Sequence, residues 1–327
     1  MKQVMKRSVS ILLCAILLLS FASCGAKEKA VVRLATLKGP TGIGSVRLME
    51  LNDAQEALNN YEISLLADPT AVIAGLAGET SEFDMAACPL NMASVLYNKT
   101  KGNIQILAVN TLGTLYLLSQ NPIETVQDLK GKTIIAAGQG ASPEYVLNYL
   151  LDENGVRNDV TVEYKSEHAE VATLAAATEQ PENTVYLLPE PNVTVTQMKN
   201  PAMKGVFDLS KAFEEVSGVS LAMGCVVVKK DFAEQNPKAV QNFMKEYEQS
   251  VAYTVENLDE TATLCEKYGI IPKAPLAKKA IPRCSITFKA GAEMQQIVLK
   301  NLTVLKDANP KAVGGKLPGD DFFYVAK

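Results

Sequence analysis

Residues 34–45 read Leu34-Ala35-Thr36-Leu37-Lys38-Gly39-Pro40-Thr41-Gly42-Ile43-Gly44-Ser45. The stretch begins inside a β-rich run, and a pattern of helical spacing then extends from about Ile43 to Leu58. Its glycines allow the backbone to turn sharply and to approach another group closely. The helix that follows presents unpaired N–H groups at its start. A strand-to-helix turn of this kind lies where open α/β sheets bind ligands.

Apolar β-like runs alternate with helical patterns along most of the chain, which predicts βαβ units and an α/β fold with mostly parallel sheets flanked by helices. From Asp231 to about Leu305 we expect almost continuous helix, and we expect Asn309–Lys327 to wrap over the surface. The predicted strands are Val31–Leu37, Glu62–Leu66, Phe83–Ala87, Ile104–Asn110, Leu115–Ser119, Thr133–Ala137, Val160–Tyr164, Thr184–Leu188 and Ala222–Val228.

A second series of strands and helices starts in the middle of the chain. Residues 124–134 have the pattern of a short helix, a glycine turn and a new strand. The chain is expected to cross between two lobes near Thr111–Leu115 and again near Gly218–Met223. We therefore predict one lobe from residues 31–113 and 221–327 and a second from residues 114–220. Small-molecule sites concentrate in the cleft between such lobes.

The N-terminus predicts export. Cations in the first seven residues precede an apolar run from about Val9 to Ala22, which is shorter than the roughly 18 residues of a membrane-spanning helix. The small residues before Cys24 resemble a bacterial lipobox, although an ordinary secretory signal with a chance cysteine is the alternative. We predict a lipoprotein signal peptide at residues 1–23 and a lipidated tether at residues 24–30. The mature protein would then lie on the extracytoplasmic face of the cell membrane, held by its lipid alone.

Composition argues against several classes of function. The formal net charge is −4 at pH 7, and removal of residues 1–23, which hold three cations and no acid, would lower it to −7. An acidic body without a basic cluster argues against nucleic-acid binding. The chain has one histidine, His168, and no CxxC pair, so we expect no transition-metal site and no cofactor. Cys265 and Cys284 could form a disulfide, but buried free thiols are favoured.

Four predicted strand ends share one pattern, in which a turn residue and a proline lead into a helix. The dipoles of these helices would favour an anionic or strongly accepting ligand group. Alternatively, the prolines only sharpen the helix starts. The ligand contacts expected at these ends are Gly39, Pro40, Thr41 and Gly42, then Ala87, Cys88 and Pro89, then Gln139, Gly140, Ala141 and Ser142.

Further polar residues complete the predicted site. Glu190, between two prolines, either caps a helix or meets an N–H or ammonium group of the ligand. Asn110 either contacts the ligand near the crossover or pins the hinge. Ser142 is expected to be a helix N-cap, and its loop lacks the lysine and the spacing of a nucleoside-triphosphate site. Tyr116, Tyr145 and Tyr149 are expected to pack.

On these residues the chain resembles the solute-binding lipoproteins of ABC importers for nitrate, sulfonates, taurine and thiamine precursors. The resemblance covers nearly all of the mature chain and implies a two-lobed periplasmic-binding fold that closes on a ligand by a hinge. It also implies delivery to a membrane permease with its ATPase, and no catalysis. The matching elements are Cys24 with its signal, the turn at Gly39–Gly44, Phe83-Asp84-Met85-Ala86-Ala87, Thr125–Lys132 with Asp128-Leu129-Lys130-Gly131-Lys132, Gly138–Ser142, Val226–Val228 and Asn236–Val240.

The chain departs from the family in two respects. No arginine falls in the expected ligand turns, since Arg33, Arg47, Arg157 and Arg283 lie elsewhere, so an inorganic anion held by a guanidinium is not expected. The cysteine-rich motif of the related pyrimidine-synthesising enzymes is missing. We expect a monomer that captures a small polar organic ligand, either sulfonate-like or a vitamin or pyrimidine precursor. The alternatives are a related enzyme acting on a cofactor precursor, and an extracytoplasmic sensor or adhesion lipoprotein with a protein partner.

Overall fold

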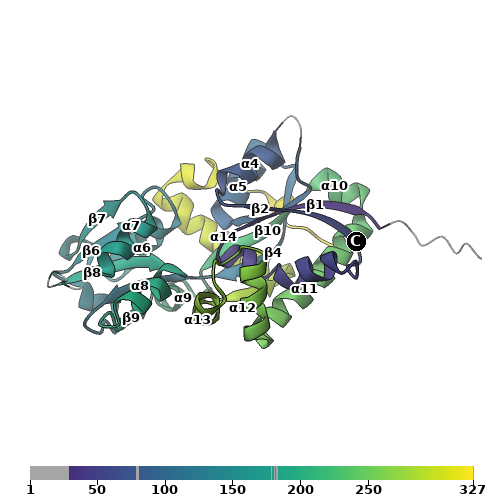
Figure 1. The fold of residues 1–327 in the computed structure, drawn as a ribbon. Coiled ribbons are helices and arrows are strands. Elements are labelled where there is room, and N and C mark those ends of the chain that lie inside the picture. The colour runs from purple at the N-terminus through teal and green to yellow at the C-terminus, as the bar shows by residue number, and fades with distance from the viewer. Residues whose placement is uncertain (1–28, 79–80, 178, 180, 182, 327) are drawn as a thin grey trace, which may run out of the picture. The chain divides into compact units, whose positions relative to one another are not determined.

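Two β-sheets organise the chain from Val31 onward (Figure 1). The computed structural model describes residues 29–78, 81–177, 179, 181 and 183–326. The predicted signal peptide and Cys24 lie outside the described residues. None of the helices in the described part of the chain is long and apolar enough to cross a membrane.

The first sheet has six strands in the order β11-β4-β10-β3-β1-β2. β1 pairs in parallel with β2 and β3, whereas β10, which returns from the second sheet, is antiparallel to both β3 and β4. The side chains of β1, β3 and β10 are mostly buried, as is typical of strands covered on both faces. The bounds are β1 (Val31–Leu37), β2 (Asn60–Leu66), β3 (Met85–Pro89), β4 (Ile104–Leu112), β10 (Ala222–Lys229) and β11 (Ile286–Lys289).

The second sheet has five strands in the order β7-β6-β8-β5-β9. β6 is parallel to β7 and β8, and β5 is antiparallel to β8 and β9. The chain passes from the first sheet to the second at residues 113–114 and returns between β9 and β10. The exact limits of two lobes remain a prediction. The bounds are β5 (Leu115–Ser119), β6 (Thr133–Ala137), β7 (Thr161–Lys165), β8 (Thr184–Pro189) and β9 (Gly205–Asp208).

Helices flank both sheets (Figure 1). The α-helices are α2 (Pro40–Ile43), α3 (Val46–Asp53), α4 (Thr70–Ala77), α5 (Leu90–Lys99), α6 (Ser142–Glu153), α7 (His168–Ala175), α8 (Asn192–Lys199), α9 (Leu209–Ser217), α10 (Lys230–Gln235), α11 (Pro237–Glu256), α12 (Leu258–Lys267), α13 (Ala274–Ala280) and α14 (Gly291–Ala308). Short 3₁₀ helices are η1 (Val126–Leu129), η2 (Arg157–Asp159), η3 (Ile281–Arg283), η4 (Pro310–Val313) and η5 (Asp320–Phe322).

Helix α14 contributes to the apolar cores of both sheets. Leu302 packs in the cluster around the first sheet, and Val304 packs in the cluster around the second. Asn301 also binds the returning chain, because its Nδ2 donates to Ser220 O at 3.0 Å and its Oδ1 accepts from Ala222 N at 3.1 Å. The second crossing between the sheets is therefore held by one helix.

The α/β fold class predicted from the sequence is confirmed, with both parallel and antiparallel pairs in each sheet. β1, β5 and β6 have their predicted bounds. The helix expected from about Ile43 to Leu58 is shorter in the structure, because α3 covers only Val46–Asp53 and is separated by Gly44 and Ser45 from the one-turn helix α2. Likewise, β11 interrupts the helical run expected between Asp231 and Leu305, and β3 starts two residues later than predicted.

The C-terminal segment does wrap over the first sheet, as predicted. Phe323 forms an isolated parallel bridge with Ile106, and Ser94 Oγ donates to Val313 O at 2.8 Å.

The cysteines of the described residues are free and buried, so Cys265 and Cys284 form no disulfide in this structure. Burial raises the pKa of the Cys265 thiol to about 12, which makes it a weak nucleophile.

Candidate ligand-binding site

The glycines in the turn after β1 are required mainly by the backbone conformation of the turn itself. Gly39 has a φ of 82°, which favours glycine, and its N–H donates to Ile270 O at 2.9 Å. At Gly42 a Cβ atom would lie 2.0 Å from Leu37 O, so the close approach that this glycine permits is to its own strand. Pro40, as predicted, is the first residue of a helix. Pro40 and Thr41 remain partly exposed beside the exposed Lys38.

Asn110 pins β4 to its neighbours. Its side chain is buried, and Nδ2 donates both to Thr41 O at 3.0 Å and to Tyr247 Oη at 2.8 Å. Its Oδ1 accepts from Thr111 Oγ1 at 3.2 Å. Both ends of the amide are thus bonded to protein groups. These contacts fit the second of the two roles expected for Asn110, the fixing of the chain near the first crossing.

The predicted contacts at the end of β3 lie mainly inside the first sheet. Ala87 and Cys88 are buried, and Cys225 of β10 pairs with Cys88. Pro89 is the last residue of β3 rather than the first of α5, and it is partly exposed. Of these three residues, Pro89 alone presents a partly exposed side chain.

The loop between β6 and α6 holds its own carboxylate. Gly138 and Gly140 both have positive φ, at 81° and 77°. The N-cap of α6 is Ala141, with extended backbone, rather than Ser142, which is already the first helical residue. Gly140 N donates to Glu144 Oε2 at 2.6 Å, so the first turn of α6 supplies the acceptor for this N–H. Gln139 is exposed.

Each of the three helices that follow the parallel strands of the second sheet has a glutamate near its start that accepts a hydrogen bond from a backbone N–H group. Glu144 accepts from Gly140 N before α6, and Glu170 accepts from Ser166 N before α7 at 3.2 Å. Glu190 precedes α8 and accepts from Thr194 N at 3.2 Å. Because a carboxylate at a helix N-terminus compensates the helix dipole, the carboxyl edge of this sheet is a poor site for a further anion.

Glu190 also meets Arg283, which lies outside the expected ligand turns in the sequence but reaches the end of β8 in space. The Glu190 side chain has no exposed surface, and Arg283 Nε lies 2.6 Å from Glu190 Oε1. Thr194 Oγ1 donates to the same oxygen at 3.1 Å. Burial raises the pKa of Glu190, and the guanidinium of Arg283 acts in the opposite direction. Nothing in the sequence spacing links the two residues, since they are brought together only by the packing of η3.

Arg283 links the predicted turn after β1 to Glu190 at the end of β8. Ile43, in the turn after β1, packs in the same apolar cluster as Ile281 and Cys284, which flank Arg283. From there the guanidinium reaches Glu190 at the end of β8. The loop at residues 138–142 lies at the carboxyl end of β6, the strand next to β8.

The remaining candidate groups are His168 and three tyrosines. His168 begins α7, and burial lowers its pKa. Its Nδ1 is buried without a hydrogen-bond partner. Among the described residues, no three His, Cys, Asp or Glu side chains are placed to hold a metal ion. Tyr116 and Tyr145 are buried in apolar clusters, and Tyr149 packs against one, as expected.

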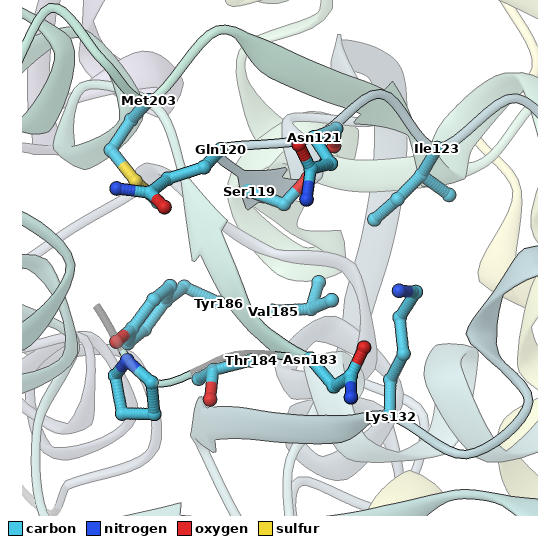
Figure 2. A pocket seen from close by; sticks show the side chains of 11 residues that line it. Ser119, Gln120, Asn121, Ile123, Lys132, Asn183, Thr184, Val185, Tyr186 and Met203 are labelled. Carbon is cyan, nitrogen blue, oxygen red and sulfur yellow. The ribbon is translucent and has the colours of Figure 1, made fainter.

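A cavity of about 170 Å³ lies at the end of the second sheet that is opposite the predicted ligand turns (Figure 2). Figure 2 shows Lys132 and Asn183 on one side of it and Gln120 and Asn121 on the other. Lys132 immediately precedes β6, whereas the predicted contacts follow β6 and β8. None of the predicted ligand contacts lines this cavity.

Known proteins share this fold. Residues 99–261, about half of the chain, match the family model described as NMT1/THI5 like. No curated protein sequence matches the chain.

Three solved structures illustrate the likeness. An ABC transporter protein from Parabacteroides distasonis is 24% identical, with 91% of this chain and 100% of that chain covered and a TM-score of 0.77. The periplasmic aliphatic sulphonate binding protein SsuA from Escherichia coli is 17% identical, with 92% and 94% covered and a TM-score of 0.66. The periplasmic nitrate-binding protein NrtA from Synechocystis PCC 6803 is 13% identical, with 77% and 69% covered and a TM-score of 0.54. The structural likeness shows the two-lobed fold of periplasmic binding proteins.

Proposed function

Because this chain carries an NMT1/THI5-like domain within a periplasmic-binding fold, we propose that it is the solute-binding component of an ABC importer. It would bind a small polar organic ligand between the two sheets and deliver it to a permease with its ATPase. The observation that carries this proposal is the meeting of polar groups from both sheets at Arg283 and Glu190, 2.6 Å apart. A ligand bound there would stabilise one arrangement of the sheets over others.

The glutamates at the carboxyl edge of the second sheet favour one class of ligand. Glu144, Glu170 and Glu190 already accept from the N–H groups that would otherwise face an anion. A ligand group that donates N–H bonds or carries positive charge therefore suits this edge better than an oxyanion. The proposed ligand is a nitrogen-containing organic molecule, in preference to the sulfonate or nitrate named for the similar proteins.

The residues proposed to touch the ligand are the exposed parts of the predicted turns. On the side of the first sheet these are Pro40, Thr41 and Pro89, which are partly exposed. On the side of the second sheet they are Gln139 and Ser142, beside the buried Glu190. Gly39, Gly140 and Ala141 are also partly or fully exposed and belong to the same proposed set, whereas the buried Gly42, Ala87, Cys88 and Asn110 would support these contacts from behind.

The proposed location follows from the N-terminal sequence. The apolar run and the small residues before Cys24 support a lipid anchor on the extracytoplasmic face of the membrane. We propose a monomer in which ligand capture needs one chain only, with no catalytic role.

A thermal-shift screen tests the proposal. The chain of residues 24–327 with Cys24→Ser would be screened against alkanesulfonates, nitrate, amino acids, pyrimidines, flavins and other vitamin precursors. A ligand at 100 times its dissociation constant adds roughly 2.7 kcal/mol to stability, a clear rise in Tm. We expect a hit among the nitrogen-containing compounds that weakens in Thr41→Ala and Gln139→Ala variants. A folded, ligand-free protein that responds to no compound would contradict the proposal.

A further inference from the structure

Arg283 is the point at which four polar groups of the second sheet and its helix α8 converge. Its Nε lies 2.6 Å from Glu190 Oε1, and a terminal guanidinium nitrogen donates to Thr194 Oγ1 at 2.7 Å. The other terminal nitrogen donates to Gln197 Oε1 at 2.9 Å. Tyr116 Oη in β5 donates to the backbone oxygen of Arg283 at 2.9 Å. We call this set of contacts the Arg283 junction.

Arg283 itself lies in a segment that packs beside the first sheet. It ends η3, and the flanking Ile281 and Cys284 pack with Ile43 of α2 and with helices α12 and α13, beside the first sheet. Figure 1 shows α8 and α13 near each other where the two sheets meet, and the two helices are in contact. The junction therefore spans the two sheets through a single side chain and its own carbonyl group.

The contacts near the second crossing differ from the Arg283 junction because they are made to the crossing segment itself. Asn301 of α14 bonds to Ser220 and Ala222, which are part of the crossing itself. A rotation of one sheet about the crossings would leave these bonds in place. The same rotation would separate α8 from η3 and break all bonds of the Arg283 junction together, because they share one residue.

We propose that Arg283 is a positioning residue that holds the two sheets in the arrangement of this structure, which we call the closed arrangement. In that arrangement the buried Glu190 carboxylate depends on the guanidinium, since an uncompensated buried charge is strongly unfavourable. Loss of Arg283 removes the compensation and the bonds to α8 in one step. Separation of the sheets then returns Glu190 to water, so the open arrangement is favoured.

The consequence for binding rests on the proposed function. If the closed arrangement is the one that holds the ligand, the apparent affinity scales with the closed fraction of the free protein. Arg283 would then set that fraction without needing to touch the ligand. The conformational part of the proposal stands independently, and its test needs no ligand.

The test measures the distance between α8 and α13 in the ligand-free protein. Spin labels on Lys199→Cys and Lys279→Cys, both exposed, report this distance by pulsed electron paramagnetic resonance, in the chain of residues 24–327 with Cys24→Ser. The cysteines of the described residues are buried and do not compete for the label. We expect Arg283→Gln to raise the ratio of long to short distances by about tenfold, which corresponds to ~1.4 kcal/mol.

Arg47→Gln is the matched control. Arg47 has a similar exposed fraction, 33% against 30%, and it pairs with Glu50 and stacks on Tyr253 without reaching the second sheet. Its distance distribution should equal that of the unsubstituted protein. Arg283→Lys keeps a cation beside Glu190 but loses the several N–H donors of the guanidinium, so it should give an intermediate distance distribution. If Arg283→Gln does not fold, the Arg283→Lys variant tests the proposal.

An unchanged distribution in the folded Arg283 variants would overturn the proposal. A widened distribution in a protein that binds no compound of the screen would support the junction and count against the importer function. The two proposals can therefore fail separately.

Discussion

The Glu144 carboxylate accepts a hydrogen bond from the Gly140 N–H at 2.6 Å, so the start of α6 is occupied by the protein's own anion. Replacement of this glutamate by alanine would free the N–H and remove a negative charge from the helix N-terminus. We expect Glu144→Ala to bind ethanesulfonate about fivefold more tightly than the unsubstituted protein, equivalent to ~1 kcal/mol. Isothermal titration calorimetry measures this difference.

Glu153→Ala is the control for that experiment. Glu153 ends the same helix and is exposed, so its loss changes the net charge equally without altering the loop before α6. If both variants gain affinity equally, the effect comes from net charge, and the role given to Glu144 is wrong.

A buried hydrogen-bond network joins β2 to α11. Tyr61 Oη donates to Glu246 Oε2 at 2.7 Å, and Leu58 N donates to Glu246 Oε1 at 2.5 Å. Both side chains are buried, and burial raises the pKa of Tyr61. Tyr61→Phe leaves a buried carboxylate oxygen with one donor fewer, so we expect a loss of about 2 kcal/mol in the free energy of unfolding, measured with urea.

Tyr97→Phe provides the comparison. Tyr97 Oη also donates to a carboxylate, that of Asp321 at 2.5 Å, but this pair lies at the surface, where water can replace the lost bond. Its effect should stay below about 0.5 kcal/mol. Equal losses in the two variants would mean that burial of the Tyr61–Glu246 pair has no energetic importance.

The strands were predictable where one apolar run of strand length is bounded by turn residues. β1, β5 and β6 meet this condition, and their predicted bounds are confirmed. β9 and β11 have four residues each, too few for a period to be recognised, and neither was predicted. The break between α2 and α3 at Gly44 also escaped prediction. A Cβ atom there would lie 3.0 Å from Val251 Cγ2, and Gly44 O accepts from Ser250 Oγ at 2.7 Å, both from residues of α11 far along the chain.

The candidate site was predictable only in its local parts. The turn residues and Glu190 follow from strand ends, which are a local property of the sequence. The partner of Glu190 does not, because Arg283 reaches it through the packing of η3 against α2, α12 and α13. Similarly, the amide of Asn110 is occupied by Tyr247 of α11, a contact that no spacing in the sequence indicates.

His168 provides a prediction on pH. Burial lowers its pKa below the ordinary value of 6.5, so the folded state binds a proton less well than the unfolded state. The stability that depends on neutral His168 is complete above pH 6.5 and is lost as the pH falls from there through the folded pKa. We expect the advantage of the unsubstituted protein over His168→Gln, measured by urea unfolding, to shrink between pH 7.5 and 5.

The chain has a single histidine, which makes this test direct. The imidazole resonance in a proton NMR titration reports one pKa, and we expect it below 6.5. A measured value at or above 6.5, or a stability difference that does not change with pH, would show that His168 is solvated.

The first crossing between the sheets requires a residue without a side chain. A Cβ atom at Gly113 would lie 1.9 Å from Ser210 Oγ and 2.2 Å from Ser210 Cβ, at the start of α9. Because the clash includes Ser210 Cβ, which no side-chain rotation can move away, Gly113→Ala should destabilise the protein by about 2 kcal/mol through overpacking. Urea unfolding measures the loss.

The double variant Gly113→Ala/Ser210→Gly separates the clash from other effects of the alanine. Ser210 Oγ is buried without a hydrogen-bond partner, so removal of the hydroxyl group breaks no bond of that atom. The Ser210→Gly single variant sets the baseline, since a glycine near the start of α9 weakens that helix by itself. Against this baseline, alanine at position 113 should cost less than about 0.5 kcal/mol. An undiminished cost would place the strain in the backbone of the crossing rather than in its contact with α9.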